Sequence, residues 1–176
     1  KKYIDNFYIT NQIEILKKQK EVNRILSKKQ YQFFKALQEV FAINFSVGNY
    51  QGYLSIFNCN PRYLETKTFQ IHYKRELVDM VEVACHESAH FAFFEYLDKN
   101  FSEQTKDLDK NNGILWEMSE IFNVIILNLP SFRKILSKEE KLFYPNLKEK
   151  LDQADIIWNS SKDINIFIAR YLNEIE

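Results

Sequence analysis

Cysteine, proline and glycine are all scarce in this sequence, and no long hydrophobic run occurs in it. Among 176 residues there are two Cys, three Pro and three Gly. Two cysteines, Cys59 and Cys85, are too few for a disulfide framework, and we expect Cys85 to behave as a small buried apolar residue. The longest apolar run, residues 124–127, is far shorter than the roughly 18 residues of a membrane span, which predicts a soluble domain with no membrane partner.

Net charge is absent as well. The 24 Lys and Arg residues balance 24 Asp and Glu residues, so the formal charge is zero, and we expect no nucleic-acid partner. A basic segment at residues 17–29 is an alternative anion site, but the interleaved Glu14 and Glu21 favour a solvated helix face. The first residue is Lys1 rather than Met, which is typical of a processed or excised chain. We favour a cytoplasmic location, with secretion after removal of a signal peptide as the alternative.

The hydrophobic fraction of 45% is sufficient for a core, and the length predicts one domain. Apolar residues recur with helical spacing before residue 44, and Ser27 with Gln30 predicts a helix over 28–43. Shorter runs with β character then predict a small antiparallel sheet of about three strands. The runs are residues 45–47, 53–57 and 66–73.

Helical spacing returns after the predicted sheet. We expect helices at 76–97 and 114–129, separated by a loop at 98–113, with Pro130 ending the second helix. Capping signals at Ser137 and Ser160, together with Pro145, predict three further helices near these positions. The order predicts an α+β domain spanning 1–176. Its parts are an N-terminal helical region (1–44), a sheet with metal-site helices (45–130) and C-terminal helices (131–176).

The sequence His-Glu-Ser-Ala-His at residues 86–90 matches the pattern H-E-x-x-H. Positions i and i+4 of a helix lie on one face, so the imidazoles of His86 and His90 can reach one metal ion. Zinc accepts neutral imidazole nitrogen, and a catalytic zinc keeps an open position for water. Glu87 lies about 100° further round the helix, where its carboxylate can take a proton from that water. The pattern predicts a Zn²⁺ site with Glu87 as general base.

A catalytic zinc usually has a third protein ligand. Glu117 and Glu120 are three residues apart on the helix predicted at 114–129, so one carboxylate can bind the metal while the other contacts a ligand histidine. We favour Glu117 as the ligand, with Glu120 as its alternative. His72, the remaining histidine, lies on the strand predicted at 66–73.

Residues 66–130 resemble the gluzincins, zinc metallopeptidases in which a glutamate helix follows the H-E-x-x-H helix. The small size resembles the minigluzincins, and residues 117–130 resemble the ImmA/IrrE-type peptidases, whose ligand glutamate stands at the position of Glu117. The resemblance implies a zincin-like fold, zinc bound by His86, His90 and one of the two glutamates, and Glu87 as base. In this chain Ile121 replaces the Asn or Asp usual in that family, which keeps Glu120 open.

The resemblance also implies that an edge strand lines the substrate cleft, and we assign this strand to residues 66–73. His72 would then stabilise the transition state, unless it is an ordinary strand histidine or a tyrosine takes that role. The tyrosines in question are Tyr50, Tyr53, Tyr73 and Tyr144. The expected function is zinc-dependent hydrolysis of a peptide or protein substrate. The alternatives are a latent or weakly active metallopeptidase-like binding domain and a zinc hydrolase of another substrate class.

Overall fold

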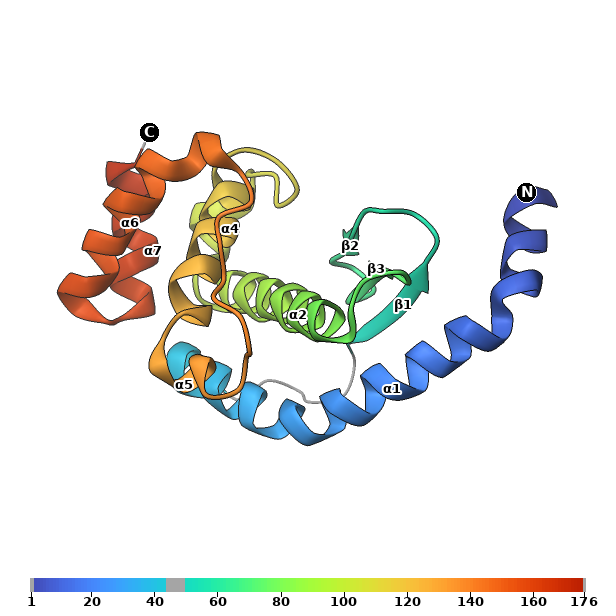
Figure 1. Ribbon diagram of the computed structural model, residues 1–176. Coiled ribbons are helices and arrows are strands. Elements are labelled where there is room, and N and C mark those ends of the chain that lie inside the picture. The colour runs from blue at the N-terminus through green and yellow to red at the C-terminus, as the bar shows by residue number, and fades with distance from the viewer. Residues whose placement is uncertain (1, 44–49, 176) are drawn as a thin grey trace.

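A helix of 40 residues, α1 (Lys2–Phe41), begins the computed structural model, which describes residues 2–43 and 50–175. The predicted helix start at residue 28 is wrong. Ser27 lies within α1, where its hydroxyl donates to the carbonyl oxygen of Arg24 (3.0 Å), so it caps nothing. Buried residues such as Val22, Phe33 and Leu37 gather in the C-terminal half of α1. The N-terminal half projects beyond the rest of the molecule (Figure 1).

Among the described residues the sheet has three strands, of which one was not predicted, and it is mixed rather than antiparallel. The strands are β1 (Gln51–Ser55), β2 (Arg62–Tyr63) and β3 (Thr68–His72), in the order β1-β3-β2. β1 pairs with β3 in parallel, because the intervening chain reverses direction through β2, which pairs antiparallel to the other side of β3. β3 is therefore the central strand, and the prediction that residues 66–73 form the edge strand is wrong. The strand predicted at residues 45–47 falls outside the described residues.

The helix with the H-E-x-x-H sequence, α2 (Leu77–Asn100), packs against α1, β3 and α4 (Gly113–Leu127). Every residue from 87 to 94 is buried, so this stretch of α2 is covered on all sides. The predicted loop at 98–113 is shorter than expected, because α2 continues to Asn100 and a turn of helix, α3 (Ser102–Thr105), follows. Of the two cysteines, both free, Cys85 is buried as expected and Cys59 is exposed.

The C-terminal part is helical, with one segment that is not. A short α5 (Pro130–Arg133) follows α4, and η1 (Pro145–Leu147) leads into α6 (Lys148–Ser161), as Pro145 indicated. No helix begins near residue 138, so that prediction is wrong. The last helix, α7 (Ile164–Glu174), begins later than predicted, because Asp163 is its cap and accepts from the backbone N–H groups of Asn165 and Ile166.

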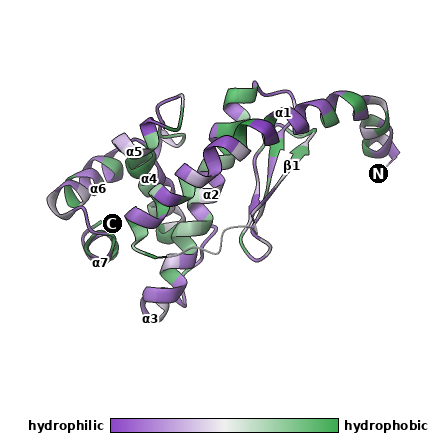
Figure 2. Ribbon diagram, turned by 90° about the horizontal axis from the view of Figure 1, so that it is seen from below, coloured by the Kyte–Doolittle hydropathy of each residue, from purple (hydrophilic) through white to green (hydrophobic). Residues whose placement is uncertain are grey.

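Phe122 of α4 lies at the centre of the core. The centroid of its ring is 4.7 to 5.8 Å from the centroids of four other aromatic rings, which come from α1, α2, α6 and α7. Hydrophobic segments gather where α2 and α4 meet in Figure 2. Within residues 2–43 and 50–175, none of the helices combines the length and the apolarity that crossing a bilayer requires.

Candidate metal centre

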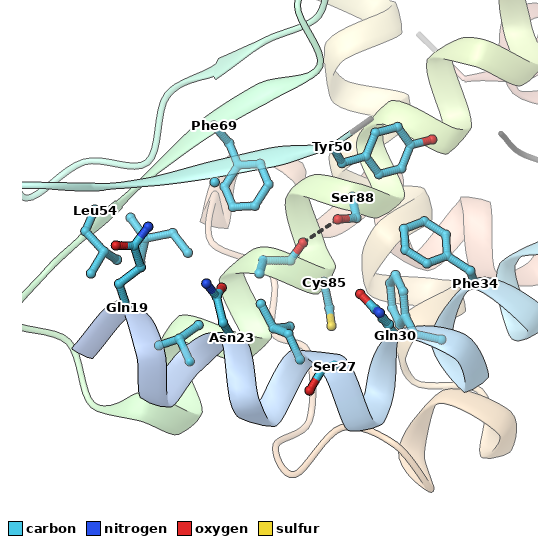
Figure 3. A pocket seen from close by; sticks show the side chains of 16 residues that line it. Gln19, Asn23, Ser27, Gln30, Phe34, Tyr50, Leu54, Phe69, Cys85 and Ser88 are labelled. Atoms are coloured by element: carbon cyan, nitrogen blue, oxygen red, sulfur yellow. Dashed lines mark hydrogen bonds between the residues drawn. The ribbon is translucent and has the colours of Figure 1, made fainter. Parts of the chain in front are cut away.

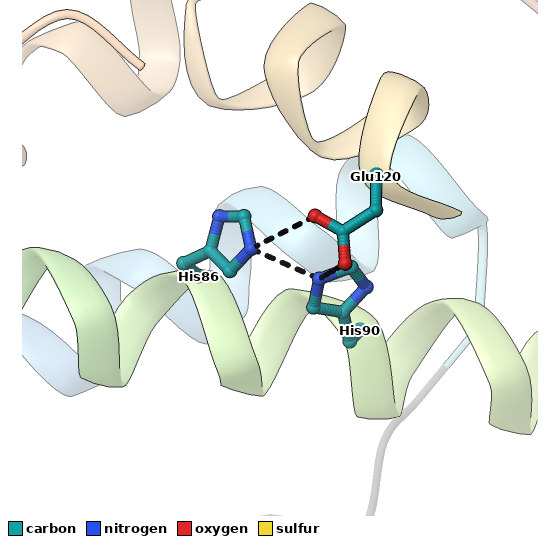
Figure 4. A group of neighbouring side chains, drawn as sticks. All are labelled: His86, His90 and Glu120. Carbon is teal, nitrogen blue, oxygen red and sulfur yellow. Dashed lines mark hydrogen bonds and ion pairs between the residues drawn. The ribbon is translucent and has the colours of Figure 1, made fainter. Parts of the chain in front are cut away.

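Three side chains from two helices converge beside the middle of α2. His86 and His90 point from α2 toward α4, and Glu120 points back from α4 (Figure 4). The Nε2 atoms of the two histidines are 2.9 Å apart. Glu120 Oε1 is 3.4 Å from His90 Nε2, and Glu120 Oε2 is 3.6 Å from His86 Nε2. These three residues could hold a metal ion between them, and in the described part of the chain they are the one such group.

Glu117 is not part of this cluster, although it was the favoured third ligand. Its carboxylate is 2.9 Å from Lys150 Nζ of α6, where both side chains are partly exposed. Three residues correspond to about 300° of helical rotation, so the two glutamates point in directions about 60° apart. The rotation of α4 about its axis directs Glu120 toward α2 and Glu117 toward α6. Glu120 is therefore the glutamate of the cluster, a choice that the sequence left open between Glu117 and Glu120.

Glu87 lies beside the cluster and is 5% exposed. Its Oε2 atom is 3.7 Å from Nη1 of Arg62, has no hydrogen-bond partner among the described residues, and is inaccessible to solvent. Burial raises the pKa of Glu87, whereas the positive charges of His86 and Arg62 oppose this rise. A buried carboxylate with a free oxygen and a raised pKa is a competent proton acceptor.

Arg62 of β2 is the cationic side chain of the site, and sequence reasoning missed it. Its Nη1 atom is 3.1 Å from Glu120 Oε1, and its side chain is 12% exposed. No local pattern indicates this role, because Arg62 reaches the cluster through the sheet and not through α2 or α4. β2 is an edge strand of the sheet, whereas β3 is central. The sheet edge next to the site is therefore that of β2, whose Arg62 side chain reaches the cluster.

Glu140 is the second residue that sequence reasoning missed. Its Oε1 atom is 3.1 Å from His86 Nδ1, on the side of the imidazole ring that faces away from His90. Glu140 follows Ser137, where a capping signal predicted the start of a helix, but residues 134–144 are not helical. Asn123 adds a further contact, since its side-chain amide donates to the backbone carbonyl of His86 (3.0 Å).

The charges of the cluster set its protonation. Burial alone would lower the pKa of His86, but hydrogen bonds with Glu120 and Glu140 raise it to about 10. Burial and the positive charge of Arg62 lower the pKa of His90 to about 3. Burial would raise the pKa of Glu120, yet the two histidines hold it far below its ordinary value. The metal-free cluster therefore contains a charged His86, a neutral His90 and an ionised Glu120 at neutral pH.

His72 lies apart from these residues, at the end of β3. Its ring packs edge-on against Tyr73, with centroids 5.6 Å apart. Its pKa is lowered by desolvation and by the positive charges of Arg75, Lys74 and Lys18, none of which belongs to the cluster. Among the four tyrosines considered, Tyr144 is the one whose raised pKa reflects the cluster, through desolvation and the nearby charge of Glu120.

A cavity of about 390 Å³ lies on the opposite face of α2, between this helix, α1 and the sheet (Figure 3). Ala84, Cys85 and Ser88 line it from α2, about half a turn of helix away from the two histidines. The described residues that line it include no Asp, Glu, Lys, Arg or His. The cavity therefore offers no metal ligands or acid–base groups comparable with those of the cluster.

Known proteins give no further information on this site. Comparison with known protein families, with curated protein sequences and with solved structures finds no match in any of the three.

Proposed function

We propose that this protein is a zinc-dependent metallopeptidase of zincin-like architecture. The observation that carries the proposal is the convergence of His86, His90 and Glu120 next to the buried carboxylate of Glu87. Two imidazole nitrogens and one carboxylate oxygen are a ligand set of catalytic zinc sites, which leave a fourth position for water or substrate. Peptide hydrolysis is the reaction that the H-E-x-x-H arrangement with a separate glutamate helix supports best.

The distances in the cluster support zinc. With bonds of about 2.1 Å, two ligand atoms of a tetrahedral zinc lie about 3.4 Å apart. Glu120 Oε1 is 3.4 Å from His90 Nε2 and Glu120 Oε2 is 3.6 Å from His86 Nε2, so each carboxylate oxygen lies close to this distance from one of the two histidines. The Nε2 atoms of His86 and His90, at 2.9 Å, need to separate by about half an ångström, which small side-chain rotations supply.

The charges also support a divalent cation. Glu87, Glu120 and Glu140 are three carboxylates, and Arg62 is the one arginine within ion-pair distance of any of them among the described residues. In the metal-free protein the charged His86 and Arg62 offset two of the three carboxylates, which leaves about −1. When both histidines are neutral, as metal ligands are, the sum is about −2, which a divalent ion neutralises. A buried excess of negative charge is costly, so the arrangement favours cation binding.

Each residue has a defined task in this proposal. A zinc ion in the site would lower the pKa of a bound water and polarise the carbonyl of the scissile bond. Glu87 would accept the proton of that water at Oε2, which has no hydrogen-bond partner among the described residues, and would pass it to the leaving amine. Arg62 places a positive charge beside Glu87 and Glu120, where it can stabilise the oxyanion, and the hydroxyl of Tyr144 is the second candidate donor.

The free edge of β2 is the proposed place for an extended substrate. A peptide can add to an exposed strand edge through main-chain hydrogen bonds. β2 is such an edge, and its Arg62 side chain reaches the cluster. This assignment replaces the strand at 66–73, which is central in the sheet.

The second candidate function is a metallopeptidase-like binding domain with little turnover. The observation that favours it is the position of Arg62, whose guanidinium pairs with the proposed base and the proposed ligand glutamate at once. If these ion pairs persist in the metal-bound protein, they hold Glu87 away from the water. The protein would then bind peptides without cleaving them.

The test compares zinc-loaded wild type with Glu87→Gln in a peptide mixture analysed by mass spectrometry. Glu95→Gln is the matched control, because Glu95 lies on the same helix and its ion pair among the described residues is with a partly exposed Lys67. We expect Glu87→Gln to keep zinc and to lose about 10²- to 10⁴-fold in cleavage rate, as for removal of a general base. Equal cleavage by the two variants would refute the assignment of Glu87. Peptide capture by zinc-loaded wild type, with no cleavage, would support the binding domain instead.

A further inference from the structure

The segment at residues 134–144, which we call the strap, has neither helix nor strand over most of its length, yet it is well connected. The strap joins α5 to η1 and is the orange segment beside α4 in Figure 1. The backbone N–H of Ser137 donates to Glu82 of α2 (2.8 Å), and Lys138 forms an ion pair with Asp79 of the same helix. These contacts attach the first half of the strap to the helix that contains both histidines.

Asn128, just after α4, holds the strap at Glu140. Its side-chain Nδ2 donates to the backbone carbonyl of Glu140 (2.8 Å), and its Oδ1 accepts from the backbone N–H of the same residue (3.0 Å). One amide side chain thus satisfies both backbone groups of Glu140, as a neighbouring strand would. This fixes the backbone of Glu140 relative to α4, the helix that contains Glu120.

Glu140 then directs its carboxylate at His86. The Oε1 atom is 3.1 Å from His86 Nδ1, and the Glu140 side chain is 18% exposed, so the contact is largely shielded from water. His90 has no equivalent, because its Nδ1 is buried without a hydrogen-bond partner among the described residues. Among the described residues, a carboxylate therefore contacts Nδ1 of His86 but not Nδ1 of His90.

We propose that Glu140 and Asn128 are positioning residues for the metal centre, a role that rests on the proposed metal site. With a metal bound, Glu140 would accept a hydrogen bond from Nδ1–H of His86, so that Nε2 of the neutral ring would be the nitrogen available as ligand. Outer carboxylates of this kind fix the tautomer and orientation of a ligand histidine and increase its basicity. Asn128 acts through Glu140, because it holds the backbone from which the carboxylate extends.

The experiment measures zinc affinity by competition with a chromophoric chelator. Glu140→Gln keeps the shape of the side chain and removes its charge, and Glu139→Gln is the matched control on the adjacent, exposed residue. We expect Glu140→Gln to bind zinc about 10- to 100-fold more weakly, as for other lost outer partners. Asn128→Ala should weaken binding in the same direction, and Glu139→Gln should match wild type.

A second readout separates positioning from a general effect on folding. In the zinc-loaded wild type, ¹⁵N spectra of the histidine side chains should show His86 with its proton on Nδ1, in a strong hydrogen bond. The Glu140→Gln variant should change this resonance while its metal-free form keeps the circular dichroism spectrum of the folded wild type. Glu140→Asp keeps the charge on a shorter side chain and should bind zinc more tightly than Glu140→Gln.

The outcomes distinguish this inference from the proposed function. Wild type that binds zinc, with an unchanged affinity and His86 spectrum in Glu140→Gln, overturns the positioning role and leaves the metal site intact. Wild type that binds no zinc overturns the metal site and this inference together. A loss of affinity in Glu139→Gln equal to that in Glu140→Gln also overturns the inference, because the effect would then be one of net charge.

Discussion

The two glutamates of α4 give the sharpest test of the metal centre, because the same substitution can be made at both. Glu120→Gln removes a carboxylate that lies 3.4 and 3.6 Å from the proposed histidine ligands. Glu117→Gln removes a carboxylate of the same helix α4 that pairs with the partly exposed Lys150 of α6. Both variants lose one negative charge, so a difference between them reports position and not net charge.

The magnitude follows from linkage between binding and folding. Zinc at 1,000 times its dissociation constant stabilises the native state by about 4.1 kcal/mol. Loss of a metal ligand should weaken zinc binding at least as much as loss of an outer partner, which weakens it roughly 100-fold. Zinc at the same concentration is then at 10 times the new constant and contributes about 1.4 kcal/mol. The difference of about 2.7 kcal/mol corresponds to about 5 to 11 °C in the unfolding temperature of a chain of this size.

The assay is thermal unfolding with and without zinc, followed by circular dichroism. We expect zinc to raise the unfolding temperature of Glu117→Gln as much as that of wild type and to raise that of Glu120→Gln much less. Loss of the partly exposed Lys150 pair should lower the stability of metal-free Glu117→Gln by at most about 1 kcal/mol. Full zinc stabilisation of Glu120→Gln, together with its loss in Glu117→Gln, would refute the assignment made from the cluster geometry.

Three further predictions concern protonation, packing and accessibility. Because the pKa of His86 is raised to about 10 and that of His90 is lowered to about 3, zinc binding near pH 7.5 should release about one proton, from His86. Calorimetry in buffers of different ionisation enthalpy measures this number. Phe122→Ala should lower the free energy of unfolding by about 3 to 5 kcal/mol in urea, because the Phe122 ring is fully buried among four aromatic rings. A thiol reagent should modify exposed Cys59 and leave Cys85, which is 4% exposed, unmodified in the native protein.

Each of these predictions has a result that contradicts it. Zinc binding without proton release would mean that His86 is neutral in the metal-free protein, against the pKa shifts of the cluster. A cost for Phe122→Ala no larger than that of Ile156→Ala, which truncates an exposed side chain on α6, would place Phe122 outside the core. Rapid labelling of both cysteines in the folded protein would contradict the packing of α2 against α1.

Local patterns predicted the helices well where tertiary contacts agree with them. The helical spacing at 76–97 corresponds to α2, and the spacing at 114–129 corresponds to α4. Local signals failed where longer-range packing opposes them. Ser27 has the sequence of a cap but lies in a helix that continues through it. Ser137 lies within the strap, where its backbone N–H donates to Glu82 of α2 instead of beginning a helix.

The sheet shows the same division between local and distant effects. The β-rich runs at 53–57 and 66–73 correspond to β1 and β3, with shifts of one or two residues at most boundaries. Their parallel pairing depends on the path of residues 56–67, which no pattern within either strand encodes. The role of Arg62 depends on the same path, since the reversal through β2 is what positions its side chain beside the cluster.

The H-E-x-x-H spacing is enough to place His86 and His90 on one face of a helix with Glu87 beside them, because residues four apart on a helix are neighbours whatever surrounds it. The choice of Glu120 over Glu117 depends on packing, because the rotation of α4 follows from how its buried residues contact several other elements. Tertiary packing likewise brings Arg62 and Glu140 to the site from segments distant in the sequence. Contacts between such segments arise from the packing of the whole chain, and the spacing of residues within one element carries no information about them.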